Sequence, residues 1–106
     1  MLFVELPSFR EFADQHWTDD ELRRLQATLI VRPDTGALIP GARGLRKLRW
    51  ALTGRGKQGG ARVIYYWLAR DERIYLVHAY AKGATADLTK HQIRVLAKLM
   101  KDEIAE

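Results

Sequence analysis

Three β-type segments in the second half of the chain restrict the fold more than any other feature of the sequence. Residues 45–52 alternate between two sides, residues 61–68 are rich in β-branched and aromatic side chains, and residues 73–81 follow a tight turn at Asp71-Glu72. Segments of this composition favour strands. Consecutive strands with short connections pair as an antiparallel meander. The sequence therefore predicts an antiparallel sheet at the centre of the fold.

A long helix is predicted over residues 18–32, because leucine and isoleucine side chains recur there on one helical face. Its first residues form a capping box, in which the Thr18 oxygen accepts from the backbone of residue 21 and the Glu21 carboxylate reaches back. Pro33 ends this helix. Residues 33–44 contain two prolines and three glycines, which predict an irregular connector.

The two ends of the chain add three further elements. Residues 2–6 form a short apolar stretch typical of a strand, and residues 8–17 predict a short helix. Thr89, with Gln92 three residues later, predicts a second capping box at the start of a C-terminal amphipathic helix. The predicted fold class is therefore α+β, with the order β-α-α-β-β-β-α and a curved antiparallel sheet on which the helices pack.

Length and composition indicate one ordinary globular domain spanning residues 1–106. The chain has no cysteine, which excludes a disulfide framework, a thiolate nucleophile and a cysteine-based zinc site. The first residues reach an acid at Glu5 and do not resemble a signal peptide, and no apolar run is long enough to cross a bilayer. We therefore expect a cytoplasmic protein.

The net charge of +5 is concentrated in one third of the chain. Residues 1–34 have seven acids and four bases, for a net charge of −3, and residues 71–106 have six of each. Residues 35–70 have eight bases and no acid, for a net charge of +8. Charge gathered in this way suggests an anionic partner. The alternative is a solvated basic face with no specific partner.

Several familiar catalytic patterns are missing from the sequence. Gly54, Gly56 and Gly59 match a dinucleotide-binding spacing, but they fall between two predicted strands rather than before a helix, and the same loop lacks the Ser or Thr of a P-loop. Carboxylate pairs occur only in predicted caps and turns, whereas a metal-dependent nuclease needs clustered acids. The histidines have no metal-ligand spacing, and His78, in mid-strand, is expected to be a hydrogen-bonded core or pocket residue. No cofactor and no metal are predicted.

The pattern that remains is a group of Lys and Arg side chains on strands and on one Gly-rich loop. Strand alternation places Lys47 and Arg49 on the same sheet face, Arg62 begins the next strand, and Lys57 lies in the loop between them. Arg can neutralise charge on the oxygens of a phosphate. A Lys with a pKa lowered by neighbouring cations can deprotonate a ribose 2′-hydroxyl, so that the RNA supplies its own nucleophile. The alternative is that these side chains only form the solvated face of a half-exposed strand.

Four runs in the last two-thirds of the chain carry a resemblance to a known family. They are L-R-K-L-R-W at 45–50, G-R-G-K-Q-G-G-A-R-V-I-Y-Y at 54–66, L-V-H-A-Y-A-K at 76–82 and D-L-T-K-H-Q at 87–92. These runs resemble the RelE/ParE superfamily of toxins from type II toxin–antitoxin systems, in its HigB-like branch. The resemblance implies a ribosome-dependent mRNA endonuclease (an mRNA interferase) that inhibits translation. It also implies a cognate antitoxin, expected to carry a DNA-binding helix-turn-helix.

The resemblance also implies site residues. The basic residues implied as catalytic are Lys47, Arg49, Lys57, Arg62 and Lys82. The residues implied to contact RNA are Arg46, Arg55 and Tyr80. The RelE pattern has a C-terminal tyrosine thought to stack on an RNA base, but this chain has no aromatic residue after Tyr80, so that Tyr80 or Trp50 would have to take its place.

Two other functions fit the same sequence. ParE-type members of the superfamily inhibit DNA gyrase without cleaving RNA, and the basic surface would then contact protein or DNA. A nucleic-acid-binding module without catalytic activity is the third possibility, and its binding would depend steeply on salt.

Overall fold

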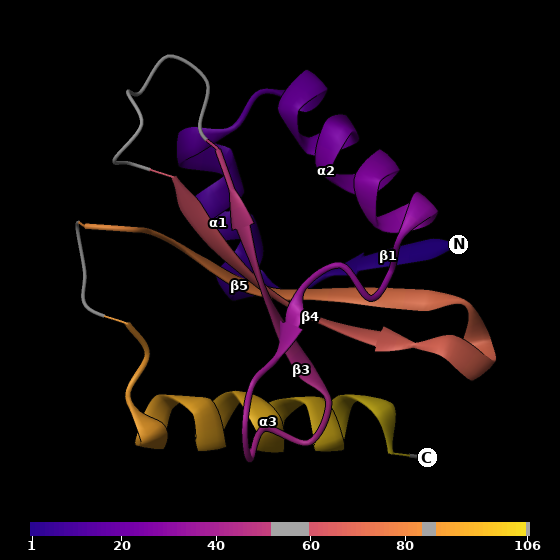
Figure 1. The fold of residues 1–106 in the computed structure, drawn as a ribbon, viewed down its shortest axis with the longest axis vertical. Helices are drawn as coiled ribbons and strands as arrows, with labels where there is room; N and C mark the ends of the chain where they lie inside the picture. Colours follow the sequence, from indigo (N-terminus) through magenta and orange to yellow (C-terminus); the bar gives the residue numbers. More distant parts are fainter. Residues whose placement is uncertain (52–59, 84–86, 106) are drawn as a thin grey trace.

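The computed structural model describes residues 1–51, 60–83 and 87–105, and these form an α+β fold built on one five-stranded sheet (Figure 1). The elements in chain order are β1 (Leu2–Glu5), α1 (Pro7–His16), α2 (Asp19–Val31), β2 (Ala37–Leu38), β3 (Leu45–Trp50), β4 (Ala61–Leu68), the 3₁₀ turn η1 (Ala69–Asp71), β5 (Arg73–Ala81) and α3 (Lys90–Ile104). The strands lie in the order β1-β5-β4-β3-β2. The central strand β4 is therefore flanked by its neighbours in sequence, as the meander prediction requires.

The helices cover both faces of the sheet, with α1 and α2 on one side and α3 on the other (Figure 1). Alternating residues of β4 face the two layers. Val63 and Tyr65 pack with α1 and α2 side chains such as Phe9 and Leu25, in a first core. Ile64 packs with Ala97 of α3 in a second core. Burial on both faces explains why β4 is almost continuously apolar.

The prediction of a wholly antiparallel sheet is wrong, because β1 pairs with β5 in parallel. A short turn forces two consecutive strands to run in opposite directions. β1 is instead joined to the rest of the sheet through two helices, so no turn fixes its direction. The sheet is mixed.

The connector predicted over residues 33–44 also contains a strand. β2 is only two residues long and pairs antiparallel with β3, with Ala37 opposite Lys47 and Leu38 opposite Arg46. Two residues are too few to show an alternating pattern, so the sequence could not reveal this strand. The observed order is therefore β-α-α-β-β-β-β-α.

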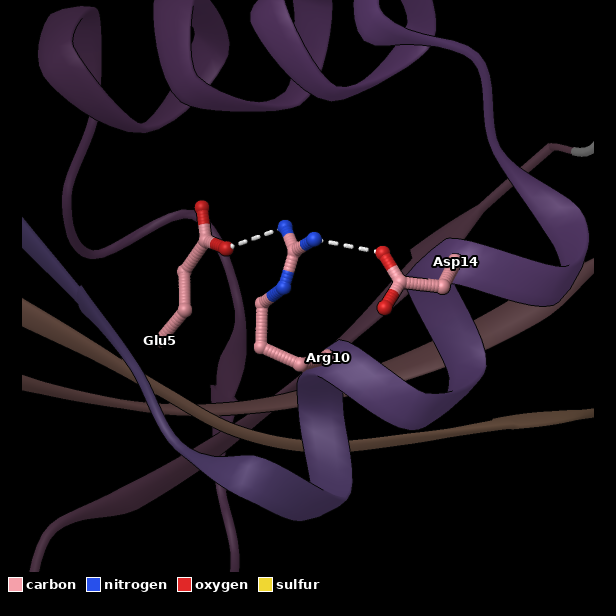
Figure 2. A network of polar contacts seen from close by, with 3 residues as sticks. All are labelled: Glu5, Arg10 and Asp14. Atoms are coloured by element: carbon pink, nitrogen blue, oxygen red, sulfur yellow. Dashed lines mark hydrogen bonds and ion pairs between the residues drawn. The ribbon is translucent and has the colours of Figure 1, made fainter.

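Both predicted capping boxes are confirmed. Thr18 accepts from the backbone of Glu21 and the Glu21 side chain accepts from the Thr18 backbone, and Thr89 and Gln92 do the same at the start of α3. A third device fixes the start of α1, which has no side-chain cap. Arg10 bridges the Glu5 carboxylate, at 2.7 Å, and the Asp14 carboxylate, at 2.5 Å (Figure 2). This bridge connects the end of β1 to the first turns of α1.

None of the helices in the described ranges has the length and apolar character required to cross a membrane.

We predict that Tyr65→Phe lowers the free energy of unfolding by about 1–3 kcal/mol, the cost of leaving a buried polar group unpaired. The Tyr65 ring is fully buried, and its hydroxyl donates to the Pro33 carbonyl at 2.7 Å and accepts from the Gly36 N–H at 2.8 Å. The matched control is Tyr75→Phe in the other core, where the hydroxyl has no hydrogen-bond partner among the described residues. Urea denaturation measures both variants. Equal losses of stability would contradict the prediction.

Candidate nucleic-acid interface

Three of the residues singled out from the sequence form one row across the sheet. Arg49 of β3 is directly opposite Arg62 of β4, and Arg62 is directly opposite Tyr80 of β5. The next row contains Lys47, Ile64 and His78. Ile64 and Tyr80 belong to the core that packs against α3, so these alternate positions face the α3 side of the sheet. The structure thus brings Lys47, Arg49, Arg62 and Tyr80 to one face.

The four side chains differ in exposure. Arg49 is exposed and Lys47 is half-buried, whereas Arg62 and Tyr80 each retain only 8% of their surface. The Arg62 guanidinium donates to the Ala61 carbonyl at 3.4 Å. Like charges directly opposite each other on neighbouring strands destabilise a sheet. A buried arginine facing a second arginine is therefore a position where an anion adds stability.

Asp87, which follows β5, supplies a negative charge beside this row. The Tyr80 hydroxyl donates to the Asp87 Oδ1 at 3.0 Å. That hydrogen bond, together with the charges of Lys47, Lys82 and Arg62, holds the pKa of the Asp87 carboxyl below its usual range. Of these basic residues, Lys47 and Arg62 share one face of the sheet with Arg49 and Tyr80. We refer to Lys47, Arg49, Arg62, Lys82, Tyr80 and Asp87 as the basic cluster.

Tyr80 keeps its proton at neutral pH. Burial of the ring, and then the hydrogen bond and charge of Asp87, raise the pKa of Tyr80 to about 12. The hydroxyl is therefore a donor, and Asp87 is an ionised acceptor. Asp87 is the member of the cluster that the sequence did not predict, because it lies outside the basic third and has no metal-ligand spacing.

Lys82 joins the cluster from the chain that leaves β5. Its backbone N–H donates to the Gly60 carbonyl at 2.8 Å. This bond holds Lys82 beside the residue that precedes β4, two positions before Arg62.

His78 is a hydrogen-bonded pocket residue, as the sequence indicated. Its Nδ1 shares a hydrogen bond with the Ser8 hydroxyl, and its ring stacks on Tyr80 with centroids 5.9 Å apart and an interplanar angle of 29°. Burial lowers the pKa of His78, and the Glu11 carboxylate partly opposes this effect. The imidazole is therefore neutral at pH 7. Among the residues that the structure describes, no three His, Asp or Glu side chains gather as a metal-binding group.

Other predicted site residues lie elsewhere. Arg46 is on the opposite face of the sheet, where it donates to the carbonyls of Asp34, at 3.2 Å, and Gly36, at 2.8 Å. Trp50 packs against the first core, which is also on that opposite face. Arg46 therefore anchors the chain before β2, and neither residue shares a surface with the basic cluster. Arg55 and Lys57 lie outside the described residues.

A search of protein-family models found none that matches the chain.

We predict that Tyr80→Phe raises the pKa of Asp87 toward 3.8, its ordinary value, because it removes the hydrogen bond that lowers this pKa most. Lys47→Met should also raise this pKa, by a smaller amount, because it removes one cation. Arg46→Met is the matched control, since Arg46 is the neighbouring residue on the opposite face of the sheet and should leave the pKa unchanged. NMR titration of the side-chain carboxyl carbons gives the three values. A response to Arg46→Met equal to that of Lys47→Met would show that the basic residues do not converge on Asp87.

Proposed function

We propose that this chain is a ribosome-dependent mRNA endonuclease, the toxin of a type II toxin–antitoxin system. The observation that carries the proposal is that Lys47, Arg49 and Arg62 share one face of the sheet, with the hydrogen bond between Tyr80 and Asp87 beside them. A group of cations on a folded sheet face is suited to a phosphodiester. The resemblance to RelE/HigB-type toxins supports the choice of RNA, the ribosome and the reaction.

The proposed reaction uses the RNA as its own nucleophile. The ribose 2′-hydroxyl loses its proton, the 2′-oxygen forms a bond to phosphorus, and the bond from phosphorus to the 5′-oxygen breaks as that oxygen gains a proton. Arg49 and Arg62 would neutralise the charge that builds on the non-bridging oxygens. Lys47, Lys82 and Lys57 would hold the phosphate and exchange protons with the two ribose oxygens. No metal and no cofactor enter this scheme.

The lowered pKa of Asp87 keeps its carboxylate ionised at neutral pH but makes it a weak base. Its part in this scheme is therefore to hold the Tyr80 hydroxyl.

In this proposal Tyr80 does not stack on an RNA base. Its ring is mostly buried and stacks on His78, so that little of its surface is open to a base. Its hydroxyl is the group placed beside the cationic residues, and we propose that Tyr80 contacts the RNA through this hydroxyl.

The resemblance supports two proposed partners. They are mRNA on the ribosome and a cognate antitoxin, expected to carry a helix-turn-helix. A protein of this kind acts in the cytoplasm, where its substrate is.

We predict that Lys47→Met, Arg49→Met and Arg62→Met each lower mRNA cleavage on purified ribosomes by about 100-fold or more, the usual cost of removing one group that stabilises transition-state charge. Primer extension on the ribosome-bound mRNA measures the cleavage. Lys47 and Arg49 are the more exposed positions, so their variants remain informative if Arg62→Met loses stability.

The matched control is Arg70→Met. Arg70 belongs to the same basic third of the sequence, but it lies beyond the far end of β4, exposed and 3.8 Å from Asp71. The Arg70→Met variant should cleave mRNA as fast as the wild-type protein. If the wild-type protein leaves mRNA intact while inhibiting gyrase supercoiling, the ParE-like function replaces the proposed one. Steeply salt-dependent RNA binding without cleavage would indicate the non-catalytic module.

A further inference from the structure

A pocket of about 350 Å³ opens beside the basic cluster at the edge of the sheet. β1 ends at Glu5, whereas β5 continues to Ala81, so the last part of β5 extends beyond its parallel neighbour. The pocket lies between α1, β5 and α3. The residues that line it include Ser8, His78, Leu88, His91, Gln92 and Val95.

The pocket combines neutral polar groups with apolar walls. Leu88 and Val95 supply apolar surface, and Val95 is 51% exposed although it is a large aliphatic residue. His78 is neutral at pH 7 because burial lowers its pKa, and with Nδ1 bonded to Ser8 it keeps Nε2 for another partner. The Gln92 oxygen accepts from the Thr89 backbone, so its amide nitrogen remains a donor. There is no carboxylate among the described residues that line this pocket, so they offer no negative charge to a cation.

Two of the residues that line the pocket are neighbours of the basic cluster. His78 stacks on Tyr80, which belongs to the row of Arg49 and Arg62. Leu88 follows Asp87, the carboxylate on which the cations converge. His78 of the pocket and Tyr80 of the cluster are two residues apart on one strand, so their Cα atoms are roughly 7 Å apart. A nucleotide has the same order of parts, an anionic phosphate joined through one ribose to a flat, neutral, hydrogen-bonding ring.

We propose that this pocket is a nucleobase subsite, which receives the base of the nucleotide whose phosphate lies in the basic cluster. The inference rests on the proposed function, since it takes RNA as the substrate, and it adds the residues that choose among bases. Sequence-specific recognition of single-stranded RNA places splayed bases against side-chain planes and bonds their edges. Leu88 and Val95 provide the apolar contact, and His78, His91 and Gln92 provide the edge contacts.

Nucleotide binding without cleavage tests the subsite. The probes are the four nucleoside 3′-monophosphates and ribose 5-phosphate, each titrated at low salt into the isotope-labelled protein and followed by NMR. At least one nucleotide should bind about tenfold tighter than ribose 5-phosphate, the gain expected from one base contact. Its signals should move at both His78 and Lys47. Ribose 5-phosphate should move Lys47 alone.

Val95→Trp should fill the pocket and remove the advantage of the nucleotide, while ribose 5-phosphate binds as before. Leu99→Trp is the matched control, because Leu99 is an exposed aliphatic residue of the same helix, at 41% exposure, that does not line the pocket. The Leu99→Trp variant should still bind the preferred nucleotide about tenfold tighter than ribose 5-phosphate. His91→Ala is a second variant, at an exposed position that lines the pocket. It should reduce the difference in affinity between the nucleotide and ribose 5-phosphate without filling the pocket.

The outcomes separate the subsite from the proposed function. If all four nucleotides bind no tighter than ribose 5-phosphate, or if Val95→Trp and Leu99→Trp behave alike, the subsite is overturned and the phosphate site stands. If neither ribose 5-phosphate nor any nucleotide moves the signals of Lys47 and Arg62, the phosphate site fails, and the proposed function and the subsite fail with it.

Discussion

The pairing of Arg49 with Arg62 on neighbouring strands is the constraint around which the basic cluster is arranged. The two residues are direct partners on β3 and β4, and Arg62 is almost fully buried. Charge held in such a place costs free energy unless it is compensated. Asp87, which is held by the Tyr80 hydroxyl, supplies a negative charge that interacts with Arg62. A carboxylate placed in this way occupies the kind of environment that a phosphate would seek.

The sheet can bear this charge because its apolar residues are packed on both sides. β4 contributes Val63 and Tyr65 to one core and Ile64 to the other, so the strand that carries Arg62 is fixed by both layers. A bulge between β4 and β5 adds a second effect. Ile64 is opposite His78 and Tyr65 is opposite Leu76, which leaves Val77 as the additional residue. Bulges redirect side chains next to functional sites, and here His78 comes to stack on Tyr80 while Val77 packs in the α3 core.

Much of this fold could be predicted from the sequence where the signal is local. Both capping boxes, and the strands β4 and β5, are where the pattern placed them, because caps and long apolar strands are determined by neighbouring residues. The parallel pairing of β1 was not predictable, since it depends on packing across two helices. Strand alternation put Lys47 and Arg49 on one face, and the same rule put Arg46 on the other. The role of Asp87 was not predictable, because its hydrogen bond with Tyr80 is a tertiary contact that no local pattern specifies.

β5 carries two neighbouring side chains, one beside the charged arginines and one in the wall of the pocket. Tyr80 and His78 are two residues apart on β5 and stack on each other, yet their surroundings differ. Tyr80 is in the row of the two arginines, whereas His78 is in the row of Lys47 and Ile64 and bonds to Ser8. Burial lowers the pKa of His78 and keeps its ring uncharged, so the positive charge ends at the cluster and does not extend into the pocket. A surface with this division distinguishes the two ends of a nucleotide, because an anionic group is drawn to the cluster and a neutral ring is not repelled from the pocket.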